Sequence, residues 1–340
     1  MSKNKIFYVL LSVFVSALLL WILLSRLEKG DLVQTFSHIY SPALLTYMAI
    51  ALLAAGLRSW RYKWLLRPEP IGWRDIFLVT LIRNLFVDLL PSRIGSLSYI
   101  YLLNKRLHYT FELAMSTFVV AFLFDFITLS PFLILSILVV GFQVTSIPLT
   151  TVFLISVLFF LLMLLILWRL TQIFSGVLRI FQAIVRIFKG ENKQWACLAI
   201  DKIQSTREHL LHLQKRKIFL PLFFLSLGIR LAKYGALYAL LFSLLRFQGI
   251  TLQNLSVWKT ILGTTGAELT SALPIKGIAG FGTWESAWAL TFQLMGFDSR
   301  LAILSGIGVH LLTNLFEYSL GILAILILAL PLLPKGKNRR

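Results

Sequence analysis

The sequence contains a single cysteine, Cys197, among its 340 residues. One thiol cannot form an internal disulfide, and it excludes a metal cluster held by several thiolates. The five histidines are scattered and form no H-E-x-x-H pattern, so the sequence predicts neither a metal site nor a cofactor. It also lacks a Walker A motif, a G-x-S-x-G motif and a D-x-D motif. These absences argue against an ATPase, a serine hydrolase and a metal-dependent nucleotide-sugar transferase.

Acidic residues are also scarce, with 14 Asp and Glu against 33 Lys and Arg, for a net charge of +19. Charged residues make up only 14% of the chain, whereas 58% of it is hydrophobic. This composition predicts an all-α polytopic membrane protein, a single membrane domain over residues 1–340. The basic residues lie between apolar runs, which indicates topology and contact with anionic lipid rather than nucleic acid.

Six apolar runs are long enough to cross a bilayer, which takes about 20 residues. They cover residues 6–24, 42–66, 113–142, 148–170, 218–245 and 301–333. The first run follows Lys3 and Lys5, and no small-residue cleavage site comes after it. We therefore expect it to be a retained signal anchor.

Two further apolar segments are interrupted and too short to cross on either side of the break. Residues 76–103 are broken by Pro91 and Gly95, and residues 255–296 by a proline and three glycines, namely Pro274, Gly277, Gly280 and Gly282. Free backbone groups are tolerated at membrane depth only inside protein or beside a wet cavity. The pattern predicts two re-entrant hairpins, and paired broken segments are typical of a transporter's substrate site.

The loops alternate between basic and uncharged, which places the N-terminus and the C-terminus in the cytoplasm. Each half then has three crossings and one hairpin. Because three is odd, the second half begins on the opposite face. The sequence thus predicts an inverted repeat, with residues 1–143 as the first unit and residues 148–334 as the second.

A basic linker over residues 169–217 carries ten basic and three acidic residues on the predicted cytoplasmic side. Leu178, Phe181, Ile184, Val185 and Phe188 recur in it at helical spacing. This spacing predicts a helix on the inner membrane surface, with anionic lipid as its partner. The alternative is a solvated loop without a specific partner.

Ionisable residues inside the apolar segments cost about 2.5–3.5 kcal/mol each, so we expect them to face the interior and pair. The expected pairs are Arg83 with Asp125, and Arg230 or Lys233 with Glu268 or Glu317. The alternative, which also covers Asp125 and His310 taken singly, is that buried polar groups only fix the packing of the helices.

The cations near the breaks predict a phosphate site, because half-helix N-termini there add N–H donors and positive dipole ends. We expect Arg93, Arg230, Lys233 and Lys276 to hold the phosphate. The acidic residues Asp88, Glu268, Glu285 and Glu317 would balance those cations and could couple protons.

Lipid headgroups are phosphates, so the predicted function is a flippase-like lipid translocase for an anionic or phosphate-headed lipid. Two alternatives stay open. One is a membrane enzyme that uses a polyprenyl-phosphate donor, and the other is a non-catalytic partner of a lipid- or glycan-synthesising enzyme.

Two stretches resemble signatures of a known family. Residues 84–103, with L-P-S-R-I-G-S-L-S-Y-I-Y-L-L, and the run G-F-G-T-W-E at 280–285 are similar to those of the lysylphosphatidylglycerol synthase/flippase transmembrane-domain family. Members resemble the flippase half of the multiple peptide resistance factor. The resemblance implies a lipid-handling protein of the bacterial or archaeal cytoplasmic (inner) membrane.

The motifs depart from that family's pattern in two places. Ser96 follows Gly95 where the family often has glutamate, and residues 276–279 interrupt a glycine cluster that is usually compact. We therefore expect a headgroup specificity unlike that of the aminoacyl-lipid members. The sequence leaves no room for a soluble aminoacyl-transferase domain, so we do not expect it to synthesise lysyl-lipid by itself.

Overall fold

The computed structural model describes residues 3–67, 69–140, 149–188, 193–216, 218–270 and 277–329. Every regular element in these ranges is helical, and no strand occurs within them. The α-helices are α1 (Lys3–Leu24), α2 (Asp31–Ser37), α3 (Ser41–Leu65), α4 (Trp73–Leu89), α5 (Ser98–Tyr101), α6 (Phe111–Val140), α7 (Leu149–Trp168), α8 (Leu170–Ile187), α9 (Gln194–Lys215), α10 (Phe219–Leu245), α11 (Val257–Leu269), α12 (Thr283–Leu294) and α13 (Ser299–Ala329). Short helical turns of other types are η1 (Pro91–Leu97), η2 (Leu102–Arg106), η4 (Arg246–Gln248) and η6 (Ile278–Gly280).

Within the described residues, five helices are long and apolar enough to cross a membrane, which makes this a polytopic membrane protein. Four of them, α3, α6, α10 and α13, coincide with predicted spans. The fifth, α8, qualifies by length and composition, although the sequence pattern predicted a surface helix there. The two remaining predicted spans are occupied by the apolar helices α1 and α7. The number of six crossings stays a prediction.

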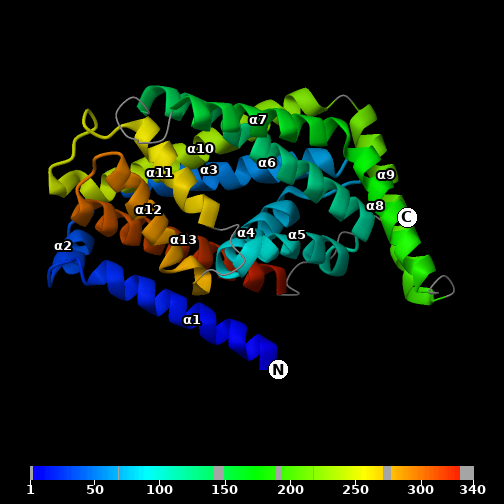
Figure 1. Ribbon diagram of the computed structural model, residues 1–340, viewed down its shortest axis with the longest axis horizontal. Coiled ribbons are helices and arrows are strands. Elements are labelled where there is room, and N and C mark those ends of the chain that lie inside the picture. The colour runs from blue at the N-terminus through cyan, green and yellow to red at the C-terminus, as the bar shows by residue number, and fades with distance from the viewer. Residues whose placement is uncertain are drawn as a thin grey trace.

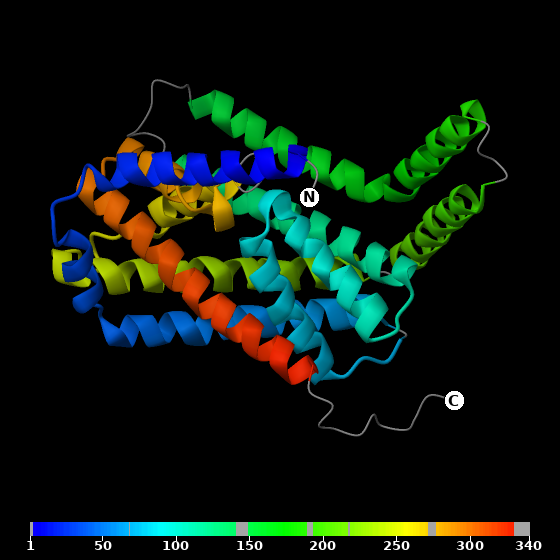
Figure 2. The same ribbon diagram turned by 90° about the horizontal axis from the view of Figure 1, so that it is seen from below.

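Helices α3 and α10 form the central pair, side by side along most of their length (Figures 1 and 2). Helix α13 crosses this pair obliquely, and α1 runs along the outside of the bundle (Figure 2). The functional side chains described below project mainly from α3, α4, α10 and α13.

The first broken segment folds back on itself. Helix α4 ends at Leu89, Pro91 starts η1, and the chain returns along α4 through α5 and η2. At Gly95 the two arms meet so closely that a Cβ would lie 1.7 Å from the carbonyl oxygen of Phe86. Only glycine fits this contact without moving the backbone. The break predicted at Pro91 and Gly95 is confirmed as the turn of a helical hairpin.

The second broken segment is also a hairpin, formed by α11 and α12. Its arms pack through glycines, since a Cβ on Gly263 would lie 2.0 Å from the ring of Phe292. Gly280 and Gly282 have φ of +83° and +84°, a region that residues with a side chain rarely adopt. They turn the chain into α12 and confirm the predicted break there. Pro274 lies outside the described residues.

The two hairpins make reciprocal contacts. Their turns, η1 and η6, touch one another near the centre of the molecule. Helix α4 of the first hairpin packs against α13, the last long helix of the second half. Helix α11 of the second hairpin packs against α6, the last long helix of the first half. The structure therefore brings both broken segments into one region.

Helices α8 and α9 form a pair that projects from one end of the bundle (Figures 1 and 2). Helix α8 is amphipathic, but its exposed apolar stripe differs from the predicted one. Val185 is buried and Phe181 contacts the ring of Trp195, so these two residues do not belong to the exposed face. The exposed stripe consists of Ile173, Val177, Ile180, Ile184 and Ile187, with Phe188 beyond it.

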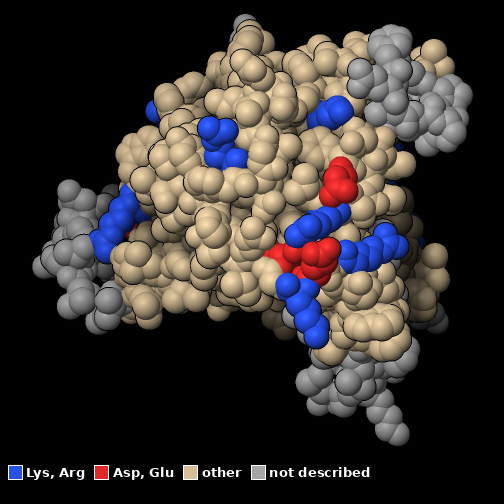
Figure 3. Space-filling view, turned by 90° about the vertical axis from the view of Figure 1, so that its left-hand side faces the viewer, with Lys and Arg blue, Asp and Glu red and all other residues tan. Residues whose placement is uncertain are grey.

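Figure 3 shows the opposite end of the molecule, where acidic and basic side chains meet in one group and further Lys and Arg side chains lie apart from it. At this end Arg300 of α13 holds Asp31 of α2, with Nε donating to Oδ2 at 2.8 Å and a second guanidinium nitrogen donating to Oδ1. This hydrogen-bonded ion pair lowers the pKa of Asp31 below its usual 3.8.

Candidate functional site

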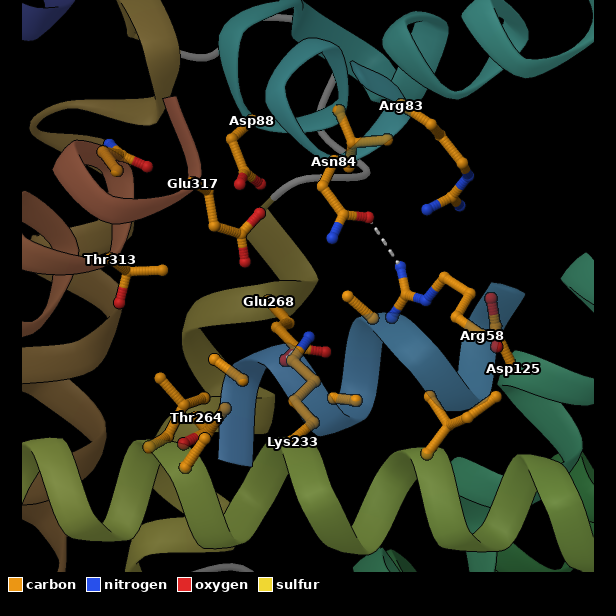
Figure 4. Close-up of a pocket in the computed structure, with 18 of the residues that line it drawn as sticks. Arg58, Arg83, Asn84, Asp88, Asp125, Lys233, Thr264, Glu268, Thr313 and Glu317 are labelled. Atoms are coloured by element: carbon orange, nitrogen blue, oxygen red, sulfur yellow. Dashed lines mark hydrogen bonds and ion pairs between the residues drawn. The ribbon is translucent and has the colours of Figure 1, made fainter. Parts of the chain in front are cut away.

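A cavity of about 260 Å³ lies between the two hairpins and the long helices (Figure 4). Its wall includes Ser96 from the turn of the first hairpin and Gly280 from that of the second. The rest comes mainly from α3, α4, α10, α11 and α13. The volume is slightly below the roughly 300–1,000 Å³ of drug-sized sites. It therefore suits a polar headgroup and is too small for a whole lipid.

The described wall carries as many acids as cations. The cations are Arg58, Arg83, Arg230 and Lys233, and the acids are Asp88, Asp125, Glu268 and Glu317. The surplus of cations expected from the sequence is therefore absent from this part of the wall. The charges instead form four separate groups, and these groups differ in how fully they are paired.

Glu268 of α11 pairs with two cations of α10. The Lys233 ammonium lies 2.5 Å from its Oε1, and Nη1 of Arg230 lies 3.6 Å from its Oε2. Arg230 and Lys233 are three residues apart and so lie on one helix face. This arrangement confirms the predicted pairing of these cations with Glu268. It also means that the two residues expected to hold a phosphate are already occupied by a carboxylate.

Asp125 of α6 pairs with Arg61 of α3, and the predicted pair with Arg83 is wrong. Nη1 of Arg61 lies 2.7 Å from Oδ1 of Asp125 and donates to the hydroxyl of Ser226 at 3.0 Å. Arg61 is completely buried behind the cavity wall. Arg230 also donates to the backbone carbonyl of Asp125. This network of buried polar contacts holds α3, α6 and α10 together.

Arg58 and Arg83 are less engaged. Nη1 of Arg58 donates to Oδ1 of Asn84 at 3.2 Å (Figure 4), and Arg83 forms no ion pair with any residue that the structure describes. The Nε atoms of both arginines are buried without a hydrogen bond to the described chain. Neither arginine forms an ion pair with a described residue, so an anion in the cavity could compensate the charge of both.

The sequence reading missed Arg58 and Arg61. Both lie near the end of the predicted span over residues 42–66, where basic residues commonly mark the cytoplasmic side. Arg58 lies eight residues before the predicted end of that apolar run, and Arg61 follows three residues later. Two arginines on one helix face inside an apolar run are the signal that could have identified them.

Asp88 of α4 and Glu317 of α13 face one another across the cavity (Figure 4). Arg58 and Lys233 line the same cavity as these two carboxyl groups. Nearby, Nδ2 of Asn314 and Oγ1 of Thr264 are buried and make no hydrogen bond with the described chain. The wall thus has an arginine side, a carboxyl side and spare polar atoms between them.

Glu285, a predicted ligand residue, is not among the described residues that line the cavity. It is fully buried, its Oε2 accepts from the backbone N–H of Gly282 at 2.7 Å, and its Oε1 lies 2.7 Å from Nδ1 of His310. The first contact caps the N-terminus of α12. His310 does line the cavity. Glu285 therefore orients the start of α12 and the His310 ring.

The remaining predicted site residues cannot be placed. The side chain of Arg93 and the whole of Lys276 lie outside the described residues. In the part of the chain that is described, no group of three histidine, cysteine or acidic side chains could hold a metal ion.

The comparison with known proteins agrees with this architecture. No curated protein matches the sequence. One family model does, the lysylphosphatidylglycerol synthase TM region, and its match runs over residues 9–321. That range includes both hairpins, the central helix pair and every described residue of the cavity wall. The chain belongs to the lysylphosphatidylglycerol synthase transmembrane-region family.

Proposed function

We propose that the protein is a flippase-like lipid translocase that moves an anionic, phosphate-headed lipid between the leaflets of a bacterial or archaeal cytoplasmic membrane. The headgroup passes through the cavity between the hairpins while the acyl chains stay in the bilayer. The observation that carries this proposal is the pair of arginines, Arg58 and Arg83, which line a headgroup-sized cavity and form no ion pair with any described residue.

The pattern of ion pairs supports this assignment. Asp125 and Glu268 are already bound by Arg61, Arg230 and Lys233. Arg58 and Arg83 contact no carboxylate in the described chain. Guanidinium groups bind phosphate oxygens in a bidentate manner, and these hydrogen bonds are stronger than neutral ones. A phosphate would supply the acceptors that this side of the cavity lacks.

The finer topology belongs to the same proposal. Six crossings and two re-entrant hairpins would form an inverted repeat, with both termini in the cytoplasm. The reciprocal contacts of each hairpin with the last long helix of the other half support the repeat.

The basic pair α8 and α9 would then lie on the cytoplasmic surface. Its exposed apolar stripe, from Ile173 to Ile187, would enter the lipid interface, with Arg179 and Arg186 beside it to contact anionic headgroups. Anionic lipid would therefore serve both as substrate in the cavity and as the surface to which this helix pair docks.

The test uses purified protein in vesicles of phosphatidylcholine that contain a fluorescent phosphatidylglycerol, with transbilayer movement followed by chemical quenching. Losing a hydrogen bond to a charged group costs about 1.5–3 kcal/mol. We expect Arg58→Gln with Arg83→Gln to slow translocation about tenfold or more. The control, Arg246→Gln, removes an exposed arginine of η4 far from the cavity wall and should leave the rate unchanged. Wild-type rates in the double variant would refute the proposal.

His310 favours a second candidate, an enzyme that uses a lipid-linked phosphate donor. Its Nδ1 is held by Glu285, which leaves Nε2 as the ring nitrogen available on the cavity side. A histidine oriented by a carboxylate is a common proton acceptor in catalysis. Incubation of the protein with polyprenyl-phosphate sugars, followed by lipid mass spectrometry, separates the two candidates, because only an enzyme changes the mass of a lipid.

A further inference from the structure

The carboxyl pair of Asp88 and Glu317 is not explained by anion binding. Both residues line the same cavity as Arg58 and Arg83, and a second carboxylate would repel a phosphate. Two ionised carboxylates in contact also repel one another, so such pairs are stable when they share one proton. Figure 4 shows the two side chains pointing toward one another, and a proton between their carboxyl groups would replace the repulsion by a hydrogen bond, because an ionised carboxylate is an acceptor only.

We propose that Asp88 and Glu317 hold one shared proton, and that uptake of this proton is coupled to binding of the headgroup phosphate at Arg58 and Arg83. This inference rests on the proposed function and deepens it, since it names the ion that accompanies the lipid. One proton and one phosphate charge would cross together, so the loaded cavity gains no net charge.

Other groups around the pair set the sign of this coupling. The described titratable and charged side chains that face it are Tyr47 and Arg58 on α3, Arg83 on α4, Lys233 on α10, Glu268 on α11, and His310 and Tyr318 on α13. Arg58 and Lys233 line the same cavity, and a positive charge nearby favours the ionised form of a carboxyl pair. Because Glu268 already neutralises much of Lys233, Arg58 is the group whose charge a bound phosphate would compensate. Binding should therefore draw a proton onto the pair, and by reciprocity acidity should tighten binding.

The carboxyl pair lies where α4 packs against α13, so its charge can affect how closely these two helices approach. Asp88 belongs to the first hairpin and Glu317 to the last long helix, so the shared proton bridges two elements that are distant in sequence. Four residues after Glu317, a Cβ on Gly321 would lie 2.4 Å from Cβ of Leu85. The helices are therefore in close contact next to the pair. Loss of the proton would place two like charges there and favour separation of α4 from α13.

An unpartnered buried group supports a polar ligand at this spot. Asn314 is 4% exposed, lines the cavity, and precedes Glu317 by one helical turn. Its Nδ2 makes no hydrogen bond to any described residue. This amide could donate a hydrogen bond to the ionised carboxyl pair or to an oxygen of a bound headgroup.

The first measurement is infrared spectroscopy of the purified protein across the neutral pH range. We expect a protonated-carboxyl band that disappears in Asp88→Asn and in Glu317→Gln and remains in the control Glu208→Gln, an exposed acid on α9. Absence of the band from wild-type protein, or its persistence in both cavity variants, would overturn the shared proton without reference to any lipid.

The second measurement is calorimetric titration with short-chain phosphatidylglycerol in buffers of different ionisation enthalpy. At a pH just above that at which the infrared band disappears, wild-type protein should take up a proton, at most one, for each lipid bound, whereas Asp88→Asn and Glu317→Gln should bind without proton uptake. Binding without uptake in wild type would overturn the coupling and leave the proposed function standing. A carboxyl band in protein that binds no phosphatidylglycerol would overturn both the coupling and an anionic lipid as substrate.

Discussion

The buried pair of Arg61 and Asp125 offers a direct test of which charges hold the fold and which serve the cavity. Arg61 has no exposed surface, and its only ion-pair partner in the described chain is Asp125, at 2.7 Å. Replacing Arg61 with leucine would leave the carboxylate in a helix bundle without its counter-charge. Removal of one member of a buried pair costs about 3–5 kcal/mol.

The expected magnitude exceeds that of ordinary polar contacts between membrane helices, which average about 0.6 kcal/mol. Arg61 is charged and also donates to Ser226, so its loss removes two contacts together. We expect Arg61→Leu to destabilise the protein by about 3 kcal/mol or more. The double variant with Asp125→Leu should recover most of that loss, because neither buried charge then lacks a partner.

Reversible unfolding in SDS, followed by tryptophan fluorescence, measures the four corners of this double-mutant cycle. Arg246→Leu is the matched control, since it removes an exposed arginine and should change stability by less than about 0.5 kcal/mol. The reasoning is refuted if Arg61→Leu is as mild as the control. It is equally refuted if the double variant loses the sum of the two single effects.

Three further outcomes follow from the structure. Gly95→Ala should destabilise the first hairpin by about 1–3 kcal/mol in thermal melts, because the added Cβ would overlap the carbonyl of Phe86. The control is Gly56→Ala, whose Cβ would meet no atom within 4 Å and which should be neutral or stabilising. Because Arg300 lowers the pKa of Asp31 in the folded protein, their contact stabilises the protein above about pH 4. This stabilisation is lost as the pH falls through the pKa of Asp31 in the folded state. Thermal melts at acidic pH should show the loss in wild type and not in Asp31→Asn. Glu285→Ala should weaken the N-terminus of α12 by about 0.5–2 kcal/mol, and preserved stability in thermal melts would contradict its capping role.

The hairpins were predictable because their causes are local. Proline removes a backbone donor, and glycine permits both close approach and positive φ, whatever the rest of the fold does. Pro91 and Gly95 therefore marked the first turn, and Gly280 and Gly282 marked the second. The long apolar helices were predictable for a similar reason, since length and composition alone decide which segments suit a bilayer.

The partner of Asp125 was not predictable in the same way. Arg61 and Arg83 are both arginines within or beside apolar runs, and either could reach a carboxylate on α6. The choice depends on the rotation of α3 and α4 about their axes, which is set by packing contacts that are distant in sequence. Gly95 lets η1 pack closely against α4, and Gly321 lets α13 do the same. In this arrangement Arg83 of α4 lines the cavity.

Helix α3 shows why only part of the candidate site could be predicted from the sequence. Arg58 and Arg61 are one turn apart, and both read as positive-inside markers because they lie near the end of an apolar run. Asp125 pairs with Arg61, whereas Arg58, one turn away, lines the cavity and contacts no carboxylate in the described chain. Charge alone does not distinguish them, because both must be compensated to be tolerated at this depth. The difference is whether the compensating anion belongs to the chain, as it does for Arg61, or must come from a ligand, as we propose for Arg58.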